Sequence, residues 1–506
     1  MSFIKQSALR IVFASIASIA VASLAHAADR PNILFIMTDD HAYQAIGAYG
    51  SNRNETPNID RMAAEGIRFD RCYVTNSICS PSRATILTGR YSHKNGVPDN
   101  RTDFDGSQTT FPKLFRSGGY QTAVIGKWHL HTEPTGFDHW EVLPGQGKYY
   151  TPDFITPAGQ APVPGYVTDI ITDKAVHWLK SQRDNSKPFL LMVQHKAPHR
   201  PWDPAPEKLK KMAGRNFPEP PTLLEDYSRR GKAAQFAELR ISQMNDRDVK
   251  LWEPDNHHRV WLFNHMVEEQ KKAWETLVDP RRAAFIAANP AGDDRTRWYY
   301  QLYMKDYLAC VDSVDDGIGQ LLSTLDELKL ADNTIVIYTS DQGFYLGEHG
   351  WFDKRMMYEE SFRTPLVIRW PGVVVPGRVE RAMVGNVDFA QTFLAAAGLK
   401  APPEMQGMSI LPILKGETPE NWRSSFYYHY YEGEEKEHKV YRHEGVTNGR
   451  AKLIHFYPID EWEMFDLEKD PQEMNNVYGL TEYAAVQREL EAELARLKKE
   501  LEVPEQ

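Results

Sequence analysis

The chain of 506 residues is 42% hydrophobic and carries a formal net charge of -10. This length and composition support a large buried core, either in one big α/β domain with an appendage or in two to three domains. The acidic balance argues against a protein that coats nucleic acid, because that function needs a clustered basic surface. Any anionic substrate must therefore be held by a local group of cations.

The N-terminal segment, residues 1–27, has the pattern of a cleaved signal peptide. Lys5 and Arg10 precede an apolar run that continues to Ala25, and Ala25 and Ala27 complete a small-x-small cleavage triplet. The run is short for a membrane span, and no other run in the chain approaches spanning length. We expect an exported protein, periplasmic or secreted, with no stable membrane insertion and a mature chain that starts near Ala28 or Asp29.

Several short apolar segments run abruptly into polar residues. They are Asn32–Met37, Thr122–Ile125, Phe189–Val193 and Thr334–Tyr338. Their continuous hydrophobicity predicts strands of a large, mostly parallel sheet that is sandwiched by helices. Because ligands bind at the carboxyl ends of such strands, we expect the polar ends of these segments to converge.

Helical signals lie between the predicted strands. Pro57 follows the capping residue Thr56 and opens a helix that ends at Gly66. Apolar residues at helical spacing predict a long amphipathic helix over 297–325. The polar, mixed stretch 204–294 is interpreted as a helical insertion within a catalytic domain that covers 28–398.

The pattern changes after Gly398. Three β-rich segments follow in quick succession before a helix that starts near Glu482: Phe426–Tyr431, Lys452–Phe456 and Glu463–Leu467. This order predicts a smaller α+β subdomain with an antiparallel sheet over 399–506, which completes the substrate pocket.

Acidic residues follow two of the predicted strands. Asp39 and Asp40 come after the first, and Asp341 and Gln342 come after the last. Ligation by oxygen alone suits a hard cation, Ca²⁺ or Mg²⁺, whereas a structural zinc site would need thiolate and imidazole ligands.

Basic residues share the same strand ends and loops. Lys127, His129, His199 and Lys354 lie there, and Arg83 follows Cys79 by one helical turn. Cations around a divalent metal make a pocket for a small multivalent oxyanion. The residues alone therefore indicate a metal-assisted hydrolase of a phosphate or a sulfate ester.

The nucleophile of such a hydrolase stays open at this level. Ser80 and Ser82 lack a flanking Gly-x-Ser-x-Gly turn, and Cys79 would need an imidazole partner to act as a thiolate. Cys72 and Cys310 are interpreted as small buried core residues, because three cysteines make no regular disulfide framework.

The segment Cys79-Ser80-Pro81-Ser82-Arg83, continued to Thr88-Gly89-Arg90, resembles the signature of the type I sulfatases of the alkaline phosphatase superfamily. In that family a formylglycine-generating or maturing enzyme oxidises the cysteine to formylglycine (3-oxoalanine), whose hydrate supplies the nucleophilic oxygen. The resemblance covers nearly the whole mature chain and implies an alkaline phosphatase-like fold.

The resemblance also implies a role for each matching residue. A Ca²⁺ ion is expected on Asp39, Asp40, Asp341, Gln342 and the formylglycine made from Cys79. Arg83 supports the modified residue, and Lys127, Lys354 and the metal stabilise the sulfuryl oxygens. His199 protonates the departing sugar oxygen, and His129 takes a proton from the remaining hydroxyl of the hydrate so that sulfate leaves.

Three further segments resemble the bacterial branch that acts on N-acetylglucosamine-6-O-sulfate in heparan- or keratan-type glycans: Gly145–Tyr150, Trp351–Arg355 and Tyr441–Gly445. The implied sugar-binding residues are Asp353, Arg355 and His443. The expected partner is a sulfated oligosaccharide. Alternatives are a sulfatase for uronic acid or galactose sulfates, a formylglycine-dependent phosphodiesterase or phosphonate hydrolase, and a non-catalytic glycan-binding protein.

Overall fold

The structure is a computed structural model that describes residues 30–228, 230–436 and 438–505. The predicted signal peptide, residues 1–27, lies outside these ranges. Every helix in the described ranges is too short or too polar to cross a membrane.

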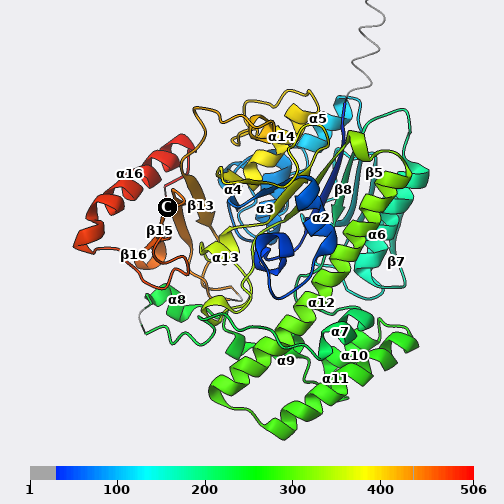
Figure 1. The fold of residues 1–506 in the computed structure, drawn as a ribbon, viewed down its shortest axis with the longest axis vertical. Helices are drawn as coiled ribbons and strands as arrows, with labels where there is room; N and C mark the ends of the chain where they lie inside the picture. The colour runs from blue at the N-terminus through cyan, green and yellow to red at the C-terminus, as the bar shows by residue number, and fades with distance from the viewer. Residues whose placement is uncertain (1–29, 229, 437, 506) are drawn as a thin grey trace, which may run out of the picture.

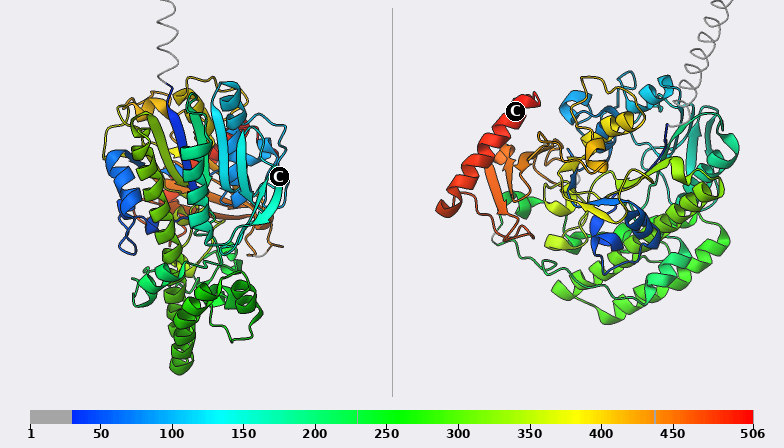
Figure 2. Two further views of the ribbon diagram at one scale, coloured as in Figure 1. Left: turned by 90° about the vertical axis from the view of Figure 1, so that its right-hand side faces the viewer. Right: turned by 45° about the horizontal axis from the view of Figure 1, so that its top comes forward.

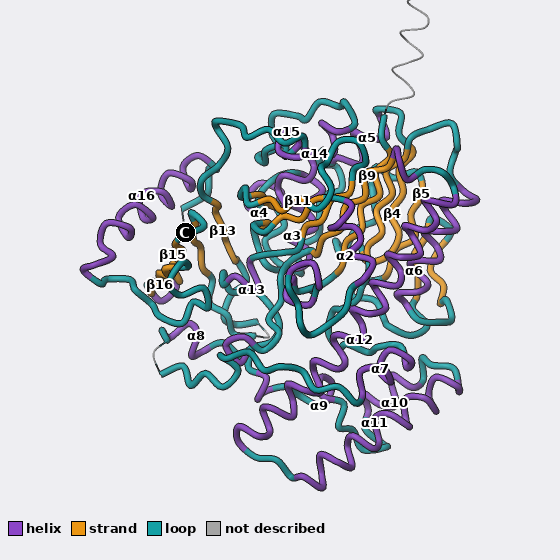
Figure 3. The backbone as a smooth tube through the Cα atoms, in the orientation of Figure 1, coloured by secondary structure: helices purple, strands orange, loops and turns teal. Residues whose placement is uncertain are grey.

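A ten-stranded sheet forms the centre of the molecule, with the strand order β11-β2-β10-β9-β1-β8-β4-β5-β6-β7 (Figure 3). The predicted strands are β1 (Asn32–Thr38), β4 (Gln121–Lys127), β8 (Phe189–Gln194) and β9 (Thr334–Ser340), and they are joined by parallel pairing. Met37 pairs with Gln194 and Thr38 with Ser340, so β1, β8 and β9 end at the same level. The prediction of a mostly parallel α/β sheet is confirmed.

The outer strands complete the sheet. They are β2 (Ile67–Phe69), β5 (His139–Leu143), β6 (Asp153–Thr156), β7 (Gly159–Pro162), β10 (Leu366–Arg369) and β11 (Arg378–Glu380). β10 runs antiparallel to both β9 and β2, and β6 and β7 are also antiparallel additions. A separate pair joins β3 (Cys72–Tyr73) to β12 (Val384–Gly385).

Helices cover both faces of the sheet (Figures 1 and 2). Leu34 and Ile36 of β1 pack with α2 (Pro57–Glu65), α6 (Val167–His177) and α12 (Gly292–Glu327). Ile33 and Phe35 point the other way and pack with α3 (Cys79–Thr88), α5 (Phe111–Ser117) and α14 (Phe389–Ala396). Because successive strand residues face opposite sides, an uninterrupted apolar strand is what two helical layers require.

The long helix predicted over 297–325 is α12, which is longer at both ends. Its N-terminal part extends beyond the sheet and packs with a helical segment at the bottom of Figure 1. That segment contains α7 (Pro206–Ala213), α9 (Asp246–Val249), α10 (His257–Phe263) and α11 (Glu268–Ala288). α8 (Lys232–Phe236) lies closer to the C-terminal sheet. The remaining short helices are α4 (Ser92–Asn95), α13 (Glu359–Phe362) and α15 (Leu411–Leu414).

The C-terminal part is an antiparallel sheet, as predicted, and it has four strands in the order β13-β14-β15-β16, of which β14 was not among the predicted segments. Its strands are β13 (Phe426–Tyr430), β14 (His443–Thr447), β15 (Ala451–Phe456) and β16 (Glu461–Asp466). The helix α16 (Ala484–Glu500) packs on this sheet through Leu490, Leu494 and Leu497, which lie at helical spacing. Figure 2 shows this unit, in orange and red, at one side of the main sheet.

A buried lysine connects the two sheets. Lys452 of β15 is completely buried, and its Nζ lies 2.7 Å from Glu473 Oε1 and 2.9 Å from Glu359 Oε1. Glu359 begins α13, in the segment that leads into β10 of the main sheet. The ion pairs therefore fix the C-terminal sheet against the segment that follows the predicted site residues 353–355.

We predict that Lys452→Met destabilises the protein by about 3–5 kcal/mol, because it leaves two carboxylates without their buried partner. The measurement is a lower midpoint of denaturant-induced unfolding. The matched control is Lys469→Met, which removes a lysine that is exposed and pairs with Asp466 at the surface. Equal midpoints for the two variants would contradict the prediction.

Candidate active site

The polar residues after β1 and β9 meet at the N-terminus of α3. Carboxylate oxygens of Asp39, Asp40 and Asp341 lie within 4.8 Å of one another. Cys79, the first residue of α3, places its Sγ 3.5 Å from Asp39 Oδ1. All of these side chains are buried. The parallel pairing of β1 with β9 explains this convergence, because it puts the residues after both strands at one edge of the sheet.

Backbone strain is concentrated around the same point. Asp40 has φ 70°, and His129, Asp353 and Arg355 also have positive φ. Non-glycine residues in such conformations each cost of the order of 1–3 kcal/mol and persist where the surroundings hold them. Asp40 is held by its backbone N–H, which donates to Asp341 Oδ1 at 3.2 Å, and by the Tyr307 hydroxyl, which donates to its carbonyl at 2.7 Å.

Each of the three carboxylates faces a cation. Lys354 Nζ donates to both oxygens of Asp40, at 2.7 and 2.8 Å. Lys127 Nζ donates to Asp39 and to Gln146 Oε1. Such buried charges are retained because the partners and hydrogen bonds compensate for lost hydration.

Arg83 pairs with the third carboxylate and links the elements around it. Its Nε and one terminal nitrogen donate to Asp341 Oδ2 at 3.1 and 2.9 Å. The other terminal nitrogen donates to the Lys127 carbonyl at 2.7 Å and to Gln194 Oε1 at 2.9 Å. The guanidinium therefore fixes α3 against the ends of β4, β8 and β9.

The oxygen-rich side of the cluster fits a hard divalent cation. Gln342 donates through Nε2 to Asp40, while its Oε1 is buried and has no hydrogen-bond partner in the described structure. Burial raises the pKa of Asp40 to about 6, although Lys354 opposes this shift. A cation held by Asp39, Asp40, Asp341 and Gln342 would supply positive charge and a partner for the amide oxygen.

Neither the thiol nor the neighbouring hydroxyls are activated as they stand. Burial raises the pKa of the Cys79 thiol to about 12, so the reactive thiolate is suppressed. Ser80 Oγ donates to the His129 carbonyl at 2.7 Å, and Ser82 Oγ donates to the Asp341 carbonyl. The two serines thus serve as structural donors, and burial disfavours the thiolate of Cys79.

Two histidines flank the cluster. His199 Nδ1 lies 2.6 Å from the Arg200 carbonyl, which leaves Nε2 facing the site 3.8 Å from Asp40 Oδ2. His129 Nδ1 lies 3.4 Å from Ser80 Oγ. Burial, reinforced by Lys127 and other nearby cations, lowers the pKa of both imidazoles well below the ordinary value. The neutral form of both imidazoles is therefore favoured, and a nearby anion would favour the protonated form.

A cavity of about 210 Å³ opens beside the cluster and is strongly cationic. Its lining residues are Asn100, Gln146, Gly147, Lys196, His199, Arg200, Arg247, Asp353, Lys354, Arg355 and His438. Asp353 forms ion pairs with Arg355 and with His438, whose Nε2 lies 3.4 Å from Asp353 Oδ2. Asp353 and Arg355, expected from the sequence to hold a sugar, thus lie in the cavity.

His443, the third expected sugar-binding residue, is not among the described residues that line the cavity. It is completely buried on β14, with Nδ1 2.8 Å from the Tyr441 carbonyl and its ring near those of Tyr428 and Tyr430. Tyr428 in turn donates from its hydroxyl to the Arg355 carbonyl. His443 therefore lies one layer behind Arg355, and His438 is the C-terminal histidine in the cavity wall.

The sequence did not single out several residues of this wall. Gln146 lies in the segment Gly145–Tyr150, and Lys196 follows the predicted strand Phe189–Val193, but nothing in the sequence distinguishes either residue from its neighbours. Arg247 comes from α9 in the 204–294 segment, where no local pattern marks a residue that reaches the site. Only the packing of α9 against α12, and the ion pair of Asp248 with Arg200, bring it to the cavity.

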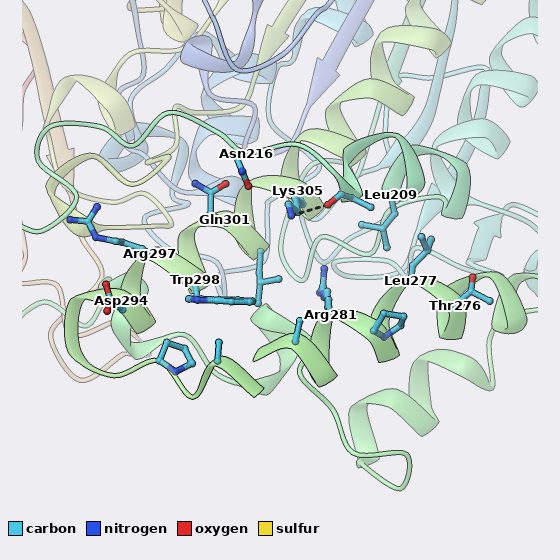
Figure 4. Close-up of a pocket in the computed structure, with 16 residues that line it drawn as sticks. Leu209, Asn216, Thr276, Leu277, Arg281, Asp294, Arg297, Trp298, Gln301 and Lys305 are labelled. Carbon is cyan, nitrogen blue, oxygen red and sulfur yellow. Dashed lines mark hydrogen bonds between the residues drawn. The ribbon is translucent and has the colours of Figure 1, made fainter. Parts of the chain in front are cut away.

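A larger cavity of about 750 Å³ lies elsewhere, between α7, α11 and α12 (Figure 4). Its cationic residues are already engaged: Arg281 pairs with Asp306 at 2.8 Å, and Lys305 donates to the Ala213 carbonyl at 2.9 Å. The described lining contains neither a cysteine nor a group of converging carboxylates. The chemistry therefore belongs to the smaller cavity.

Comparison with known proteins agrees with this geometry. Residues 31–399 match the family model "Sulfatase", and residues 347–500 match the model "N-sulphoglucosamine sulphohydrolase, C-terminal". The chain is 51% identical over 475 residues to the N-acetylglucosamine-6-O-sulfatase of Bacteroides thetaiotaomicron, covering 91% of this chain and 85% of that protein. It is 29% identical to human N-acetylglucosamine-6-sulfatase over 78% of this chain and 66% of that protein.

A solved structure is similar over nearly the whole chain. It is that of BT4656 in complex with its substrate D-glucosamine-2-N,6-O-disulfate. The two chains superpose with a TM-score of 0.91 at 49% identity, over 94% of this chain and 98% of that one.

We predict that a hard divalent cation, supplied as Ca²⁺, stabilises chelator-treated protein. A ligand that binds only the folded state adds about 2.7 kcal/mol at 100 times its Kd. The measurement is the shift in thermal unfolding midpoint on adding Ca²⁺. Asp341→Asn should lose most of this shift, whereas Asp332→Asn, at an exposed aspartate outside the cluster, should keep it. Equal shifts in both variants would place the cation elsewhere.

Proposed function

Because the chain belongs to the sulfatase family and is a sulfuric ester hydrolase, we propose that it removes the 6-O-sulfate of N-acetylglucosamine-type residues in glycosaminoglycan-type glycans. The observation that carries this proposal is the half-identical relative that bears this activity in its name, together with a cationic cavity beside Cys79 and the carboxylate cluster. In this function the cavity binds the sulfated sugar.

The chemistry at residue 79 depends on two groups that the family uses. Conversion of Cys79 to formylglycine supplies a hydrated aldehyde oxygen as the nucleophile, and a bound Ca²⁺ supplies Lewis-acid stabilisation of the sulfuryl oxygens. Asp39, Asp40, Asp341 and Gln342 are the residues that hold the metal in this proposal. Arg83 holds Asp341 in place from α3.

Lys127 and Lys354 position the sulfate group. Each ammonium is buried and points at the carboxylate cluster from a different side. A sulfuryl group between them is stabilised by the two ammonium groups, which are already in position before the reaction starts. Preorganised charges of this kind are usually the largest contribution to transition-state stabilisation. The buried site also excludes water that would screen these charges.

His199 and His129 move protons on the two sides of the sulfur. His199 Nε2, free of the hydrogen bond that occupies Nδ1, delivers a proton to the departing sugar oxygen. The charge of a bound sulfate counters Lys127 and Lys354 and so favours the protonated form of His199. His129 accepts a proton from the side chain at position 79 during release of sulfate.

The pocket gives the sugar fixed partners. Asp353 and Arg355 contact each other and present a carboxylate and a guanidinium to the cavity, with His438 on the carboxylate's other side. Such paired groups hydrogen-bond to sugar hydroxyls in a defined orientation. His443 supports this wall from behind, through the tyrosines that it contacts.

Production of the active enzyme involves two further steps in this proposal. A formylglycine-generating or maturing enzyme converts Cys79, and the N-terminal signal peptide directs export to the periplasm or the outside of the cell. The support for both is the sequence pattern around Cys79 and over residues 1–27.

The test is sulfate release from defined saccharides by protein in which Cys79 has been converted, with Ca²⁺ present. We expect kcat/KM for N-acetylglucosamine 6-sulfate to exceed that for galactose or uronic acid sulfates by about 100-fold, because misplaced hydroxyls leave buried polar groups unpaired. Nitrophenyl phosphate measured in parallel tests the phosphoesterase alternative, and Cys79→Ala is the inactive control. Turnover of only galactose or uronic acid sulfates would overturn the proposed substrate.

A further inference from the structure

The backbone of residues 40–42, which follows β1 and Asp39, is held by side chains. Three successive backbone N–H groups each donate to a side chain: Asp40 to Asp341 Oδ1 at 3.2 Å, His41 to Ser340 Oγ at 2.8 Å, and Ala42 to the Tyr307 hydroxyl at 2.8 Å. Ser340 ends β9 and Asp341 follows it, whereas Tyr307 belongs to the helix α12. α12 therefore takes a direct part in fixing the chain at the carboxylate cluster.

The Tyr307 hydroxyl bonds to this segment in two directions. It donates to the Asp40 carbonyl at 2.7 Å and accepts from the Ala42 N–H at 2.8 Å. Asp40 has φ 70°, so the chain leaves the extended conformation of the strand at this point. Buried backbone groups that leave a strand need other hydrogen-bond partners. The hydroxyl supplies one partner to each of the two residues that flank His41.

The ring of Tyr307 has a separate packing role. Tyr307 is completely buried, and its ring stacks on that of Phe344 with the centroids 5.7 Å apart and the planes 8° apart. Phe344 follows Gln342 by two residues, and Lys354 Nζ lies 5.7 Å from the centroid of the Phe344 ring. A phenylalanine at position 307 would keep this stack and would lose only the hydroxyl.

The turn of α12 that carries Tyr307 is fixed from its other side. The neighbouring residue, Asp306, is completely buried, and its carboxylate lies 2.8 Å from Arg281 and 3.1 Å from Lys250 Nζ. Arg281 and Lys250 belong to the 204–294 segment. These ion pairs hold α12 between that segment and the sheet, so the hydroxyl is a stationary partner for the backbone that follows β1.

We propose that Tyr307 is a positioning residue of the cation site, whose hydroxyl holds Asp40 in the conformation that directs its carboxylate toward Asp39 and Asp341. This inference rests on the metal site of the proposed function and deepens it. Rotation of Asp40 to a negative φ would relieve backbone strain and would turn its carboxylate away from the cluster. The two hydrogen bonds of the hydroxyl oppose that rotation. Tyr307 acts on the cation through Asp40.

The test is calorimetric titration of Ca²⁺ into the chelator-treated full chain. We expect Tyr307→Phe to raise the Kd for Ca²⁺ about 10- to 100-fold, the range typical of losing a group that orients a metal ligand. The matched control is Tyr300→Phe, which removes another buried hydroxyl of α12, one that donates to the Pro218 carbonyl at 2.5 Å. Tyr300→Phe should leave the Kd unchanged.

Thermal unfolding without Ca²⁺ separates positioning from stability. Both phenylalanine variants remove a hydrogen bond to a buried backbone group, so both should lower the unfolding midpoint. We expect only Tyr307→Phe to change the Kd. An unchanged Kd in Tyr307→Phe would overturn the inference. A loss of affinity in Tyr307→Leu that is absent in Tyr307→Phe would also overturn it, because the ring and not the hydroxyl would then matter.

Hydrogen exchange of the parent protein gives a measurement that needs no variant. We expect the amide of Ala42 to be protected as strongly as the amides of β1, because its partner is a buried hydroxyl on a fixed helix. Fast exchange at Ala42 would overturn the inference. A parent protein that binds no Ca²⁺ would overturn the proposed metal site together with it, whereas release of sulfate from N-acetylglucosamine 6-sulfate tests the proposed substrate separately.

Discussion

The structure depends on the burial of three carboxylates at the meeting point of β1, β9 and α3. Asp39, Asp40 and Asp341 are close enough to repel one another strongly, and they have been removed from water. Lys127, Lys354 and Arg83 offset that repulsion from three directions. The sheet, the helix and the strained backbone at Asp40 are all arranged so that this balance of charge holds.

The same balance explains why the site suits an anionic ester in an acidic protein. The net charge of the chain is negative, yet the cavity wall beside the cluster is cationic. Fixed charges within a sheltered site act over short distances, where screening by solvent and salt is weak. The overall acidity therefore does not oppose local binding of sulfate.

The sequence predicted the parallel sheet well, because continuous apolar strands between helices leave few other architectures. It also predicted which polar strand ends would meet. β1 and β9 are parallel neighbours, so Asp39, directly after β1, and Asp341, directly after β9, lie at the same edge of the sheet. Cys79 and Arg83 could be identified from their resemblance to a known motif. These predictions depend on short stretches of chain and on the rule that the carboxyl ends of parallel strands lie at one edge of the sheet.

Several other residues that line the cavity could not be predicted, because tertiary packing brings them there and no local sequence pattern indicates that packing. Arg247 is an ordinary exposed arginine until α9 is placed beside the turn at Lys196 and His199. His438 and His443 lie five positions apart, and only the path of the chain into β14 decides which one faces the cavity. The 204–294 segment gave no indication of its role, and it now contributes Arg247 and the Asp248 that fixes Arg200.

The central claim is that a converted Cys79, held against the carboxylate cluster, provides the attacking oxygen. The most direct measurement is mass spectrometry of the peptide that contains residue 79, made on several preparations whose sulfatase activity is measured in parallel. The account predicts that a peptide with an aldehyde in place of the thiol-bearing group is present and that activity is proportional to its fraction. Full activity in a preparation whose Cys79 is entirely unmodified would contradict it.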